Sequence, residues 1–416
     1  MRNTTQYILK RLLYMIPMVL VITFLIYGGL ELTPGDAISH MIPPDQLANV
    51  NPEQLEALRE SYGLNDPFLL RYVRWLGELL HGNFGYSIAS GVPIKDILLQ
   101  LFPATLELSL AALAISSVLG SIPSFRTPFV LMPQSLGESR QLPAMLRDQG
   151  YSTAFFCGSE YGSMGFGAYA RSAGVERLVS REDYEAKYGK GDFDGYWGIW
   201  DEPFLQFTGE ELSQMPEPFF ATLFTLSSHH PFVVPAQYED KLPDGYTKIH
   251  KGVAYDDNAF RLFFERFGSE EWFRRTLFVF VADHVSSEKF AAQTRSYPGN
   301  YHIIGFMYTP DGALRGEVSE VVQQLDIMPT LLGLLGNREP YFAFGRDVLN
   351  EPQRPQWSVS WDGAFQAVTN DGTIRFDDAQ ETPAASSAGD SLLQDFRALV
   401  QQYYSHAEKK SYIVHD

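Results

Sequence analysis

Apolar and polar residues follow two different patterns along the chain, and these patterns separate a membrane-like part from a soluble part. Residues 12–30 read LLYMIPMVLVITFLIYGGL and carry no charge. About 20 apolar residues span a bilayer, so this run predicts a transmembrane helix, with a buried helix of a soluble domain as the alternative. A second apolar run covers residues 101–120 and contains Glu107 near its start. A carboxylate is tolerated there if it reaches the membrane interface, so a second span is predicted.

The residues around these runs indicate an anchored protein. Arg2, Lys10 and Arg11 precede the first run, which predicts an N-terminus in the cytoplasm. No small-residue cleavage site follows the run, so we interpret it as an anchor and not as a removed signal peptide. The segment 31–100 between the two runs reads as soluble, with helix signals over 51–64.

After residue 121 helical and strand patterns alternate, which is typical of a soluble domain. The pattern predicts helices over 143–149, 250–267 and 326–336, and strands over 151–157, 218–228, 276–283 and 301–310. The run TLFVFVAD (276–283) is continuously apolar, as expected for a strand covered on both faces. This alternation predicts an α/β fold with a mostly parallel sheet flanked by helices.

Residues 351–416 are more polar and loosely patterned. DGTIRFDD (371–378) predicts a pair of strands, ETPAASSAGD (381–390) a loop, and residues 391–410 an amphipathic terminal helix. We interpret this part as a C-terminal extension that decorates the surface of the domain. The predicted division is therefore 1–120, 121–350 and 351–416.

Composition narrows the classes of function. The net charge of −18 argues against a nucleic-acid partner, because phosphate binding needs clustered Lys and Arg. Cys157 is the single cysteine, which excludes an intramolecular disulfide and a multi-cysteine metal site. A buried cysteine on the strand over 151–157 is the favoured interpretation of this residue.

Two predicted strands end in residues that can carry chemistry. Asp283 and His284 follow one strand, and His229 and His230 follow another. Ligands of α/β sheets bind at the carboxyl ends of strands, and an adjacent carboxylate and imidazole suit Zn or Mn. The alternative is that Asp283 caps a turn with His284 exposed, and that the two histidines are ordinary loop residues. Because neighbouring side chains alternate in direction, at most one of His229 and His230 faces a site.

The first 120 residues resemble the N-terminus of a dipeptide/oligopeptide ABC transporter permease. The phrases that carry the resemblance are YILKRLLYMIPMVLVITFLIYGGLELTPGD, LRESYGLNDPFLLRYVRWLGELLHGNFGYSIASGVPIKDIL and LFPATLELSLAALAIS. The resemblance implies a first membrane helix, an external segment and the start of a second helix. A permease fragment for peptide transport is therefore the alternative function, although no later run is long enough to span a membrane.

Residues from about 121 to 360 resemble the sulfatase/alkaline phosphatase superfamily, most closely its lipoteichoic acid synthase branch. The phrases are QLPAMLRDQGYSTAFFCGS, WGIWDEPFL, PFFATLFTLSSHHPFVVP, AYDDNAFRLFFE, TLFVFVADHVSS, YHIIGFMYTP and QQLDIMPTLLGLLG. This branch transfers glycerol phosphate from a membrane lipid through a phosphothreonine enzyme. The resemblance therefore implies a lipid donor, a divalent metal (Mn, Zn or Mg) and a place in the bacterial cytoplasmic membrane.

The resemblance also implies roles for single residues. Asp283 and His284 correspond to ligands of the catalytic metal, and His229 to a contact of the substrate phosphate. His302 corresponds to a ligand of a second metal in some relatives, or to a plain strand residue. Three further aspartates match family positions and are interpreted as helix caps or loop anchors: Asp201, Asp257 and Asp326.

The family pattern is incomplete at its start. In the family, a buried strand ends in a glutamate metal ligand, and a nucleophilic threonine follows at a helix N-terminus. Here GSIPSFRTPF (120–129) matches the end of that region, and permease-like sequence stands before it. Thr105 lies in the membrane-like run and Thr127 lies past the expected place, so we identify no nucleophile and expect an inactive domain. The missing strand would leave its neighbours with an unpaired edge.

Other interpretations stay open at this point. A true sulfatase forms its nucleophile in a C/S-x-P-x-R phrase, but Phe125 stands at the arginine position and Arg126 one place later. A non-catalytic binding module is a further alternative. The sequence leaves open the side of the membrane that carries the domain, and the number of subunits.

Overall fold

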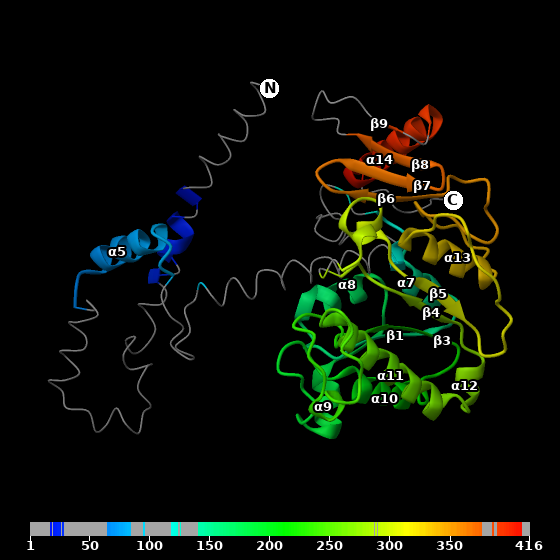
Figure 1. Cartoon of the computed structure of the whole chain (residues 1–416), viewed down its shortest axis with the longest axis horizontal. Helices are drawn as coiled ribbons and strands as arrows, with labels where there is room; N and C mark the ends of the chain where they lie inside the picture. The colour runs from blue at the N-terminus through cyan, green and yellow to red at the C-terminus, as the bar shows by residue number, and fades with distance from the viewer. Residues whose placement is uncertain are drawn as a thin grey trace. The chain divides into compact units, whose positions relative to one another are not determined.

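The computed structural model describes two compact units, residues 1–105 and 106–416 (Figure 1). The described residues are 17–18, 20–25, 27–28, 65–84, 95, 118–123, 125, 140–286, 288, 290–376, 385–386 and 389–409.

The first unit contains α5 (Phe68–Leu80), which packs against the short helical stretch before it in the chain. The Tyr72 hydroxyl donates a hydrogen bond to the carbonyl of Leu20 at 3.1 Å, and Phe24 contacts the Tyr72 ring edge to face. No helix among the described residues is long and apolar enough to cross a bilayer. The predicted spans over 12–30 and 101–120 lie partly or largely outside the described residues, and the helix predicted over 51–64 lies wholly outside them.

A parallel sheet lies at the centre of the second unit. Strand β1 (Ser152–Cys157) pairs in parallel with β2 (Arg177–Val179) on one side and with β3 (Phe219–Phe224) on the other. The helix before β1 is α7 (Leu142–Asp148), so the predictions of a helix over 143–149 and a strand over 151–157 are confirmed to within one residue. Gly150 separates the two elements with a φ of +92°, a conformation that glycine adopts without strain.

The two later strands form a separate antiparallel pair, β4 (Phe278–Val281) with β5 (Gly305–Tyr308). The prediction of a mostly parallel sheet is therefore correct for β1–β3 only. Helices cover β4 on both faces, as expected, but all four of its residues are only half-buried. The cause is the edge of β4 opposite β5, where the described residues supply no hydrogen-bonded neighbour.

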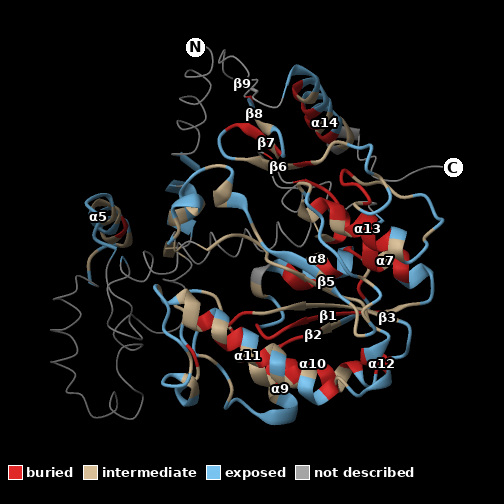
Figure 2. Ribbon diagram, turned by 45° about the vertical axis from the view of Figure 1, so that its right-hand side comes forward, coloured by how far each residue is buried: buried red, intermediate tan, exposed pale blue. Residues whose placement is uncertain are grey.

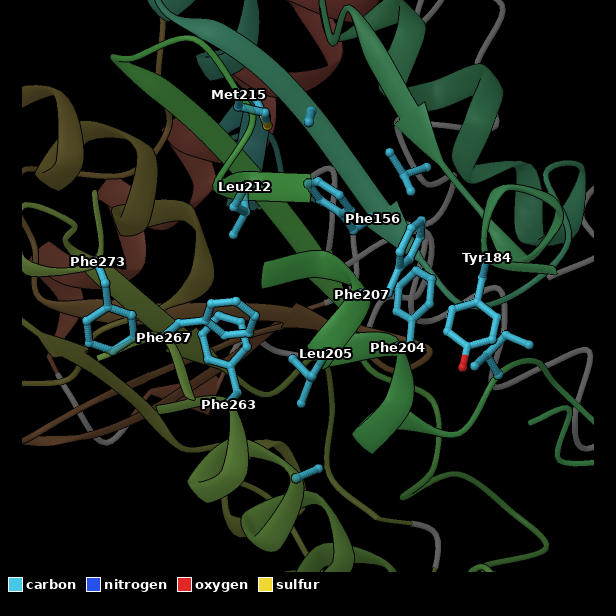
Figure 3. Packing of buried hydrophobic residues seen from close by; sticks show 14 of the residues in the cluster. Phe156, Tyr184, Phe204, Leu205, Phe207, Leu212, Met215, Phe263, Phe267 and Phe273 are labelled. Atoms are coloured by element: carbon cyan, nitrogen blue, oxygen red, sulfur yellow. The ribbon is translucent and has the colours of Figure 1, made fainter. Parts of the chain in front are cut away.

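Helices cover both faces of these strands. The lower layer in Figure 2 contains α9 (Arg181–Tyr188), α10 (Asp201–Leu212), α11 (Ile249–Phe267) and α12 (Glu271–Arg274). The upper layer contains α7, α8 (Phe166–Ser172) and α13 (Ile327–Leu334). Figure 3 shows the aromatic core between β1 and the lower layer, with Phe156, Phe204 and Phe263 among its buried side chains. Short 3₁₀ helices connect the elements: η3 (Ser163–Gly165), η4 (Ala236–Tyr238), η5 (Ala292–Arg295), η6 (Gly299–Tyr301) and η7 (Gln324–Asp326).

The C-terminal residues form a second layered structure with its own core. Strands β6 (Trp357–Trp361), β7 (Phe365–Thr369), β8 (Gly372–Phe376) and β9 (Ala385–Ser386) form an antiparallel sheet, and α14 (Asp390–Lys409) packs on it. The buried side chains of this core include Trp357, Phe365, Phe376, Phe396 and Tyr403. The structure thus corrects two expectations: this part does not merely decorate a surface, and residues 371–378 contribute one strand instead of two.

The start of the domain is held inside this C-terminal core. Ile122 and Phe125 are buried within it. The Ser121 hydroxyl donates to the carbonyl of Leu325 at 2.7 Å and accepts from the backbone N–H of Gly345 at 2.9 Å. The place where the two family resemblances meet in the sequence is therefore an integral part of the fold.

Candidate functional site

Asp283 and His284 lie in a tight turn directly after β4. The backbone N–H of His284 donates to Asp283 Oδ1 at 2.8 Å, and His284 Nε2 lies 3.5 Å from Asp283 Oδ2. The Gln324 side-chain amide donates to the carbonyls of Ala282 and Asp283, both at 2.9 Å, and so fixes the turn from η7. Both side chains are partly exposed, at 30 and 25 %. A small cation could therefore reach the carboxylate and the imidazole together.

The surroundings of His284 determine which ring nitrogen is available. His284 Nδ1 lies 2.7 Å from the carbonyl of Val285, which can only accept a hydrogen bond, so Nδ1 carries the proton of the neutral ring. Nε2 then has a free lone pair on the side of Asp283. A carbonyl that orients the second ring nitrogen is the usual arrangement of a metal-binding histidine. The pair is thus suited to supply two donors, one oxygen and one nitrogen.

His302 lies at the same end of the β4–β5 ribbon. The register pairs Val281 with Gly305, and the backbone N–H of Ala282 donates to the carbonyl of Ile304 at 3.0 Å. His302 is exposed in the loop between η6 and β5. Within the described part of the chain, no three His, Cys, Asp or Glu side chains are grouped closely enough to hold a metal ion. Zn sites normally take at least three protein ligands, so these residues do not complete a metal site.

His229 and His230 follow β3, and the structure separates them. His229 is half-buried, with its ring 4.3 Å from the Trp197 ring in an edge-to-face contact. Its backbone N–H donates to the carbonyl of Leu226 at 3.1 Å. His230 is exposed, and its carbonyl accepts a hydrogen bond from Trp197 Nε1 at 2.5 Å. Only His229 is therefore turned inward, on a turn that Trp197 supports.

The N-terminal end of α11 connects these two turns. The backbone N–H of Ile249 donates to Glu288 Oε2 at 3.1 Å, which ties the helix to the loop after Asp283 and His284. Gly252 packs on the turn before His229, where an added Cβ would lie 3.3 Å from Ser228 Cα. The two candidate loops thus share one neighbour. The sequence reasoning did not identify Glu288 or Gly252, because ordinary helix and loop positions give them no distinctive pattern.

Asp201 fixes the turn before His229. It is 2 % exposed at the start of α10, and its carboxylate accepts hydrogen bonds from the backbone N–H groups of Leu226 at 2.9 Å and Ser227 at 2.7 Å. Asp326 similarly accepts from the backbone N–H of Arg346 at 2.9 Å. The interpretation of these two residues as anchors is confirmed. It was wrong for Asp257, which is exposed in the middle of α11.

A second buried carboxyl, Asp256 of α11, lies beside Asp201 and Ser228. Burial raises the pKa of Asp256 well above its ordinary value, and the nearby Asp201 charge raises it further. Burial also raises the pKa of Asp201, although its hydrogen bonds from Ser227 oppose this shift. The raised pKa of Asp256 favours its protonated form in the folded protein, because burial disfavours the charged carboxylate.

The pH dependence of stability should report this pair. A carboxyl with a raised pKa in the folded state stabilises the fold below its unfolded pKa of about 4, and that stability is lost as the pH rises through the folded pKa. The loss per proton reaches about 1.4 kcal/mol per pH unit. We expect Asp256→Asn, which keeps the site neutral, to flatten the decline in the free energy of unfolding above pH 4. Urea unfolding at several pH values tests this. If the free energy of unfolding fell equally with pH in the variant and in the natural protein, the prediction would be contradicted.

Comparison with known proteins agrees with both resemblances. The sulfatase family model matches residues 111–337. The lipoteichoic acid synthase-like protein YvgJ of Bacillus subtilis is 25 % identical over 218 residues, which cover 48 % of this chain and 34 % of that protein. The oligopeptide transport system permease protein AppB of Bacillus subtilis is 36 % identical over 118 residues, or 28 % of this chain and 36 % of that protein. The chain thus spans about a third of the length of each of these relatives.

Solved structures show the same fold. A protein of the alkaline phosphatase superfamily from Vibrio parahaemolyticus has a TM-score of 0.61 at 22 % identity, covering 73 % of this chain and 76 % of that chain. The lipoteichoic acid synthase LtaP from Listeria monocytogenes has a TM-score of 0.59 at 21 % identity, covering 73 % of this chain and 81 % of that chain. The fold is therefore the α/β fold of alkaline phosphatases and sulfatases, with a parallel sheet. Because the family model covers more than half of its residues, the chain belongs to the sulfatase family.

Proposed function

We propose that this chain is a membrane-anchored protein of the phosphoglycerol transferase type, whose domain binds a phosphate ester but does not transfer it. The family match and the similarity to YvgJ and LtaP support the substrate class, a glycerol phosphate ester of a membrane lipid. The apolar run over 12–30 supports the anchor, in the bacterial cytoplasmic membrane. In this proposal the His229 imidazole contacts the phosphate.

The observation that carries the proposal is the donor pair after β4. Asp283 Oδ2 and His284 Nε2 lie 3.5 Å apart and can both reach one divalent cation, whether Mn, Zn or Mg. The described residues bring no third carboxylate, imidazole or thiolate to the pair. Two donors hold a cation weakly, and a weakly held cation activates no nucleophile effectively. We have also identified no threonine at the family's nucleophile position.

The test is a titration of the full-length chain in detergent with Mn²⁺. We expect a dissociation constant in the range of about 0.1–1 mM that weak protein cation sites show. Asp283→Ala should weaken binding at least tenfold, since it removes one of the two donors. Asp311→Ala removes an exposed carboxylate on the loop after β5 and serves as the control, with unchanged binding expected.

Turnover decides between binding and catalysis. We expect release of glycerol phosphate from phosphatidylglycerol vesicles at the rate of the buffer alone, with or without Mn²⁺. Mn²⁺-dependent release that disappears in Asp283→Ala would show an active transferase or hydrolase and contradict the proposal. Equal Mn²⁺ affinity of the natural protein and Asp283→Ala would contradict the assignment of the pair.

A second candidate function rests on the N-terminal part alone. Its 36 % identity to AppB supports a permease fragment that inserts into the bilayer and pairs with a permease subunit. The described part of α5 presents exposed apolar side chains that such a contact would cover, namely Leu69, Val73 and Leu80. Residues 1–120 produced as a separate segment should then co-purify with a permease subunit of this transporter class. Co-purification of residues 121–416 instead would contradict this second function.

A further inference from the structure

Two edge strands of the second unit, β3 and β4, lie between its helix layers, and each has one open edge. β3 is hydrogen bonded to β1 on one side, and β4 to β5 on one side. Among the described residues, neither strand has a hydrogen-bonded neighbour on its other side. Every backbone N–H and C=O group of a strand needs a partner, and an open edge therefore favours the addition of another strand.

The two strands lie in one layer of the domain. Phe219 of β3 and Phe278 of β4 pack in the same cluster with α10 and α11. Phe220 of β3 and Val279 of β4 pack in a second common cluster, with α7 and α13 on the opposite face. Figure 1 shows the β1–β3 and β4–β5 pairs as separate ribbons between these helices. The same two helix layers thus cover both strands, although the strands do not bond to each other.

Burial locates the gap in this layer. β1 is buried at five of its six positions, whereas all six residues of its neighbour β3 are half-buried, as are all four of β4. β1 and β3 share their helix layers, so the helices do not explain the difference. The difference follows from the side of β3 that lacks a neighbouring strand. The same reason applies to β4.

We propose that the space between β3 and β4 accepts an extended apolar segment of another polypeptide, which adds the missing strand of the sheet. Only an extended backbone can hydrogen bond to two strand edges at once, as in other cases of strand addition. The clusters on both faces consist of apolar side chains, so the added strand is apolar on both faces. The two edges, FFATLF and FVFV, carry no charge, and their lengths fit a segment of about four to six residues.

The test uses the full-length chain and a synthetic peptide of about six alternating valine and isoleucine residues, with two lysines at each end for solubility. Hydrogen exchange is followed at single amides of β3 and β4 with and without the peptide. We expect at least tenfold slower exchange at those amides of residues 219–224 and 278–281 that point away from β1 and β5, because these amides gain acceptors. A peptide of the same length with proline at two central positions is the matched control and should leave exchange unchanged.

Three outcomes would overturn the proposal. Full protection of both strands in the free chain would mean that this chain's own residues occupy the gap. Slower exchange only at the other open edges, those of β2, β5, β6 or β9, would place peptide binding elsewhere. Equal protection by the proline peptide would show that no strand is added. None of these outcomes depends on whether the domain binds phosphate esters, so this inference and the proposed function fail independently.

Discussion

Replacing Phe396 by alanine is expected to lower the free energy of unfolding of the domain by about 3–5 kcal/mol. Phe396 is fully buried on α14, and its ring lies 5.3 Å from the Phe376 ring and 5.7 Å from the Trp357 ring, measured between centroids. The substitution leaves a cavity at the centre of the C-terminal core, which the rigid sheet fills poorly. Urea unfolding followed by tryptophan fluorescence measures the loss.

The control for this prediction is Gln394→Ala on the same helix. Gln394 is exposed, so its replacement should change the free energy of unfolding by no more than about 0.5 kcal/mol. A small effect of both substitutions would mean that residues 351–416 are a separable surface layer. A large effect of Phe396→Ala alone would establish that they complete the domain.

Asp201→Ala is expected to lower the free energy of unfolding by about 2–4 kcal/mol. The substitution leaves the buried N–H groups of Leu226 and Ser227 without their acceptor, and each such group carries its full desolvation penalty. Asp201→Asn retains one acceptor oxygen and should cost less. The measurement is urea unfolding together with hydrogen exchange at Leu226 and Ser227, where the alanine variant should exchange faster.

Asp257→Ala is the matched control, since Asp257 is the exposed neighbour of buried Asp256. We expect no more than about 0.5 kcal/mol of change. If Asp201→Ala and Asp257→Ala behaved alike, Asp201 would not fix the turn that carries His229. The turn would then depend on the Trp197 contact alone.

Local pattern was enough to predict the elements whose neighbours lie close in the sequence. The helix α7 and the strand β1 are separated by a glycine that ends the helix, and α11 repeats its apolar residues at helical spacing. The turn after β4 was also predictable, because strand ends in α/β folds carry ligands. Asp283 and His284 are consecutive residues of one turn, so their proximity follows from the sequence itself.

Features that depend on distant residues could not be predicted in this way. The sheet is divided because no described strand is hydrogen bonded to the second edge of β3 or β4, and no local pattern reveals this. The C-terminal core was missed because polar residues stand next to Phe365 and Phe376, namely Gln366 and Arg375, so the average polarity of these strands conceals their buried side chains. Asp256 and Asp257 are adjacent and chemically equal, and only the packing of α11 against α10 decides which one is buried.

The hydrogen bonds of Ser121 have a consequence for how the protein is made. Its hydroxyl bonds to Leu325 and Gly345, which lie 204 and 224 residues later in the chain. At a synthesis rate of about 5–20 residues per second, Leu325 is added roughly 10–40 s after Ser121. The aromatic side chains that enclose Phe125, including Tyr403, are added later still. The segment around Ser121 and Phe125 therefore cannot complete its packing until residues 325–403 have been synthesised.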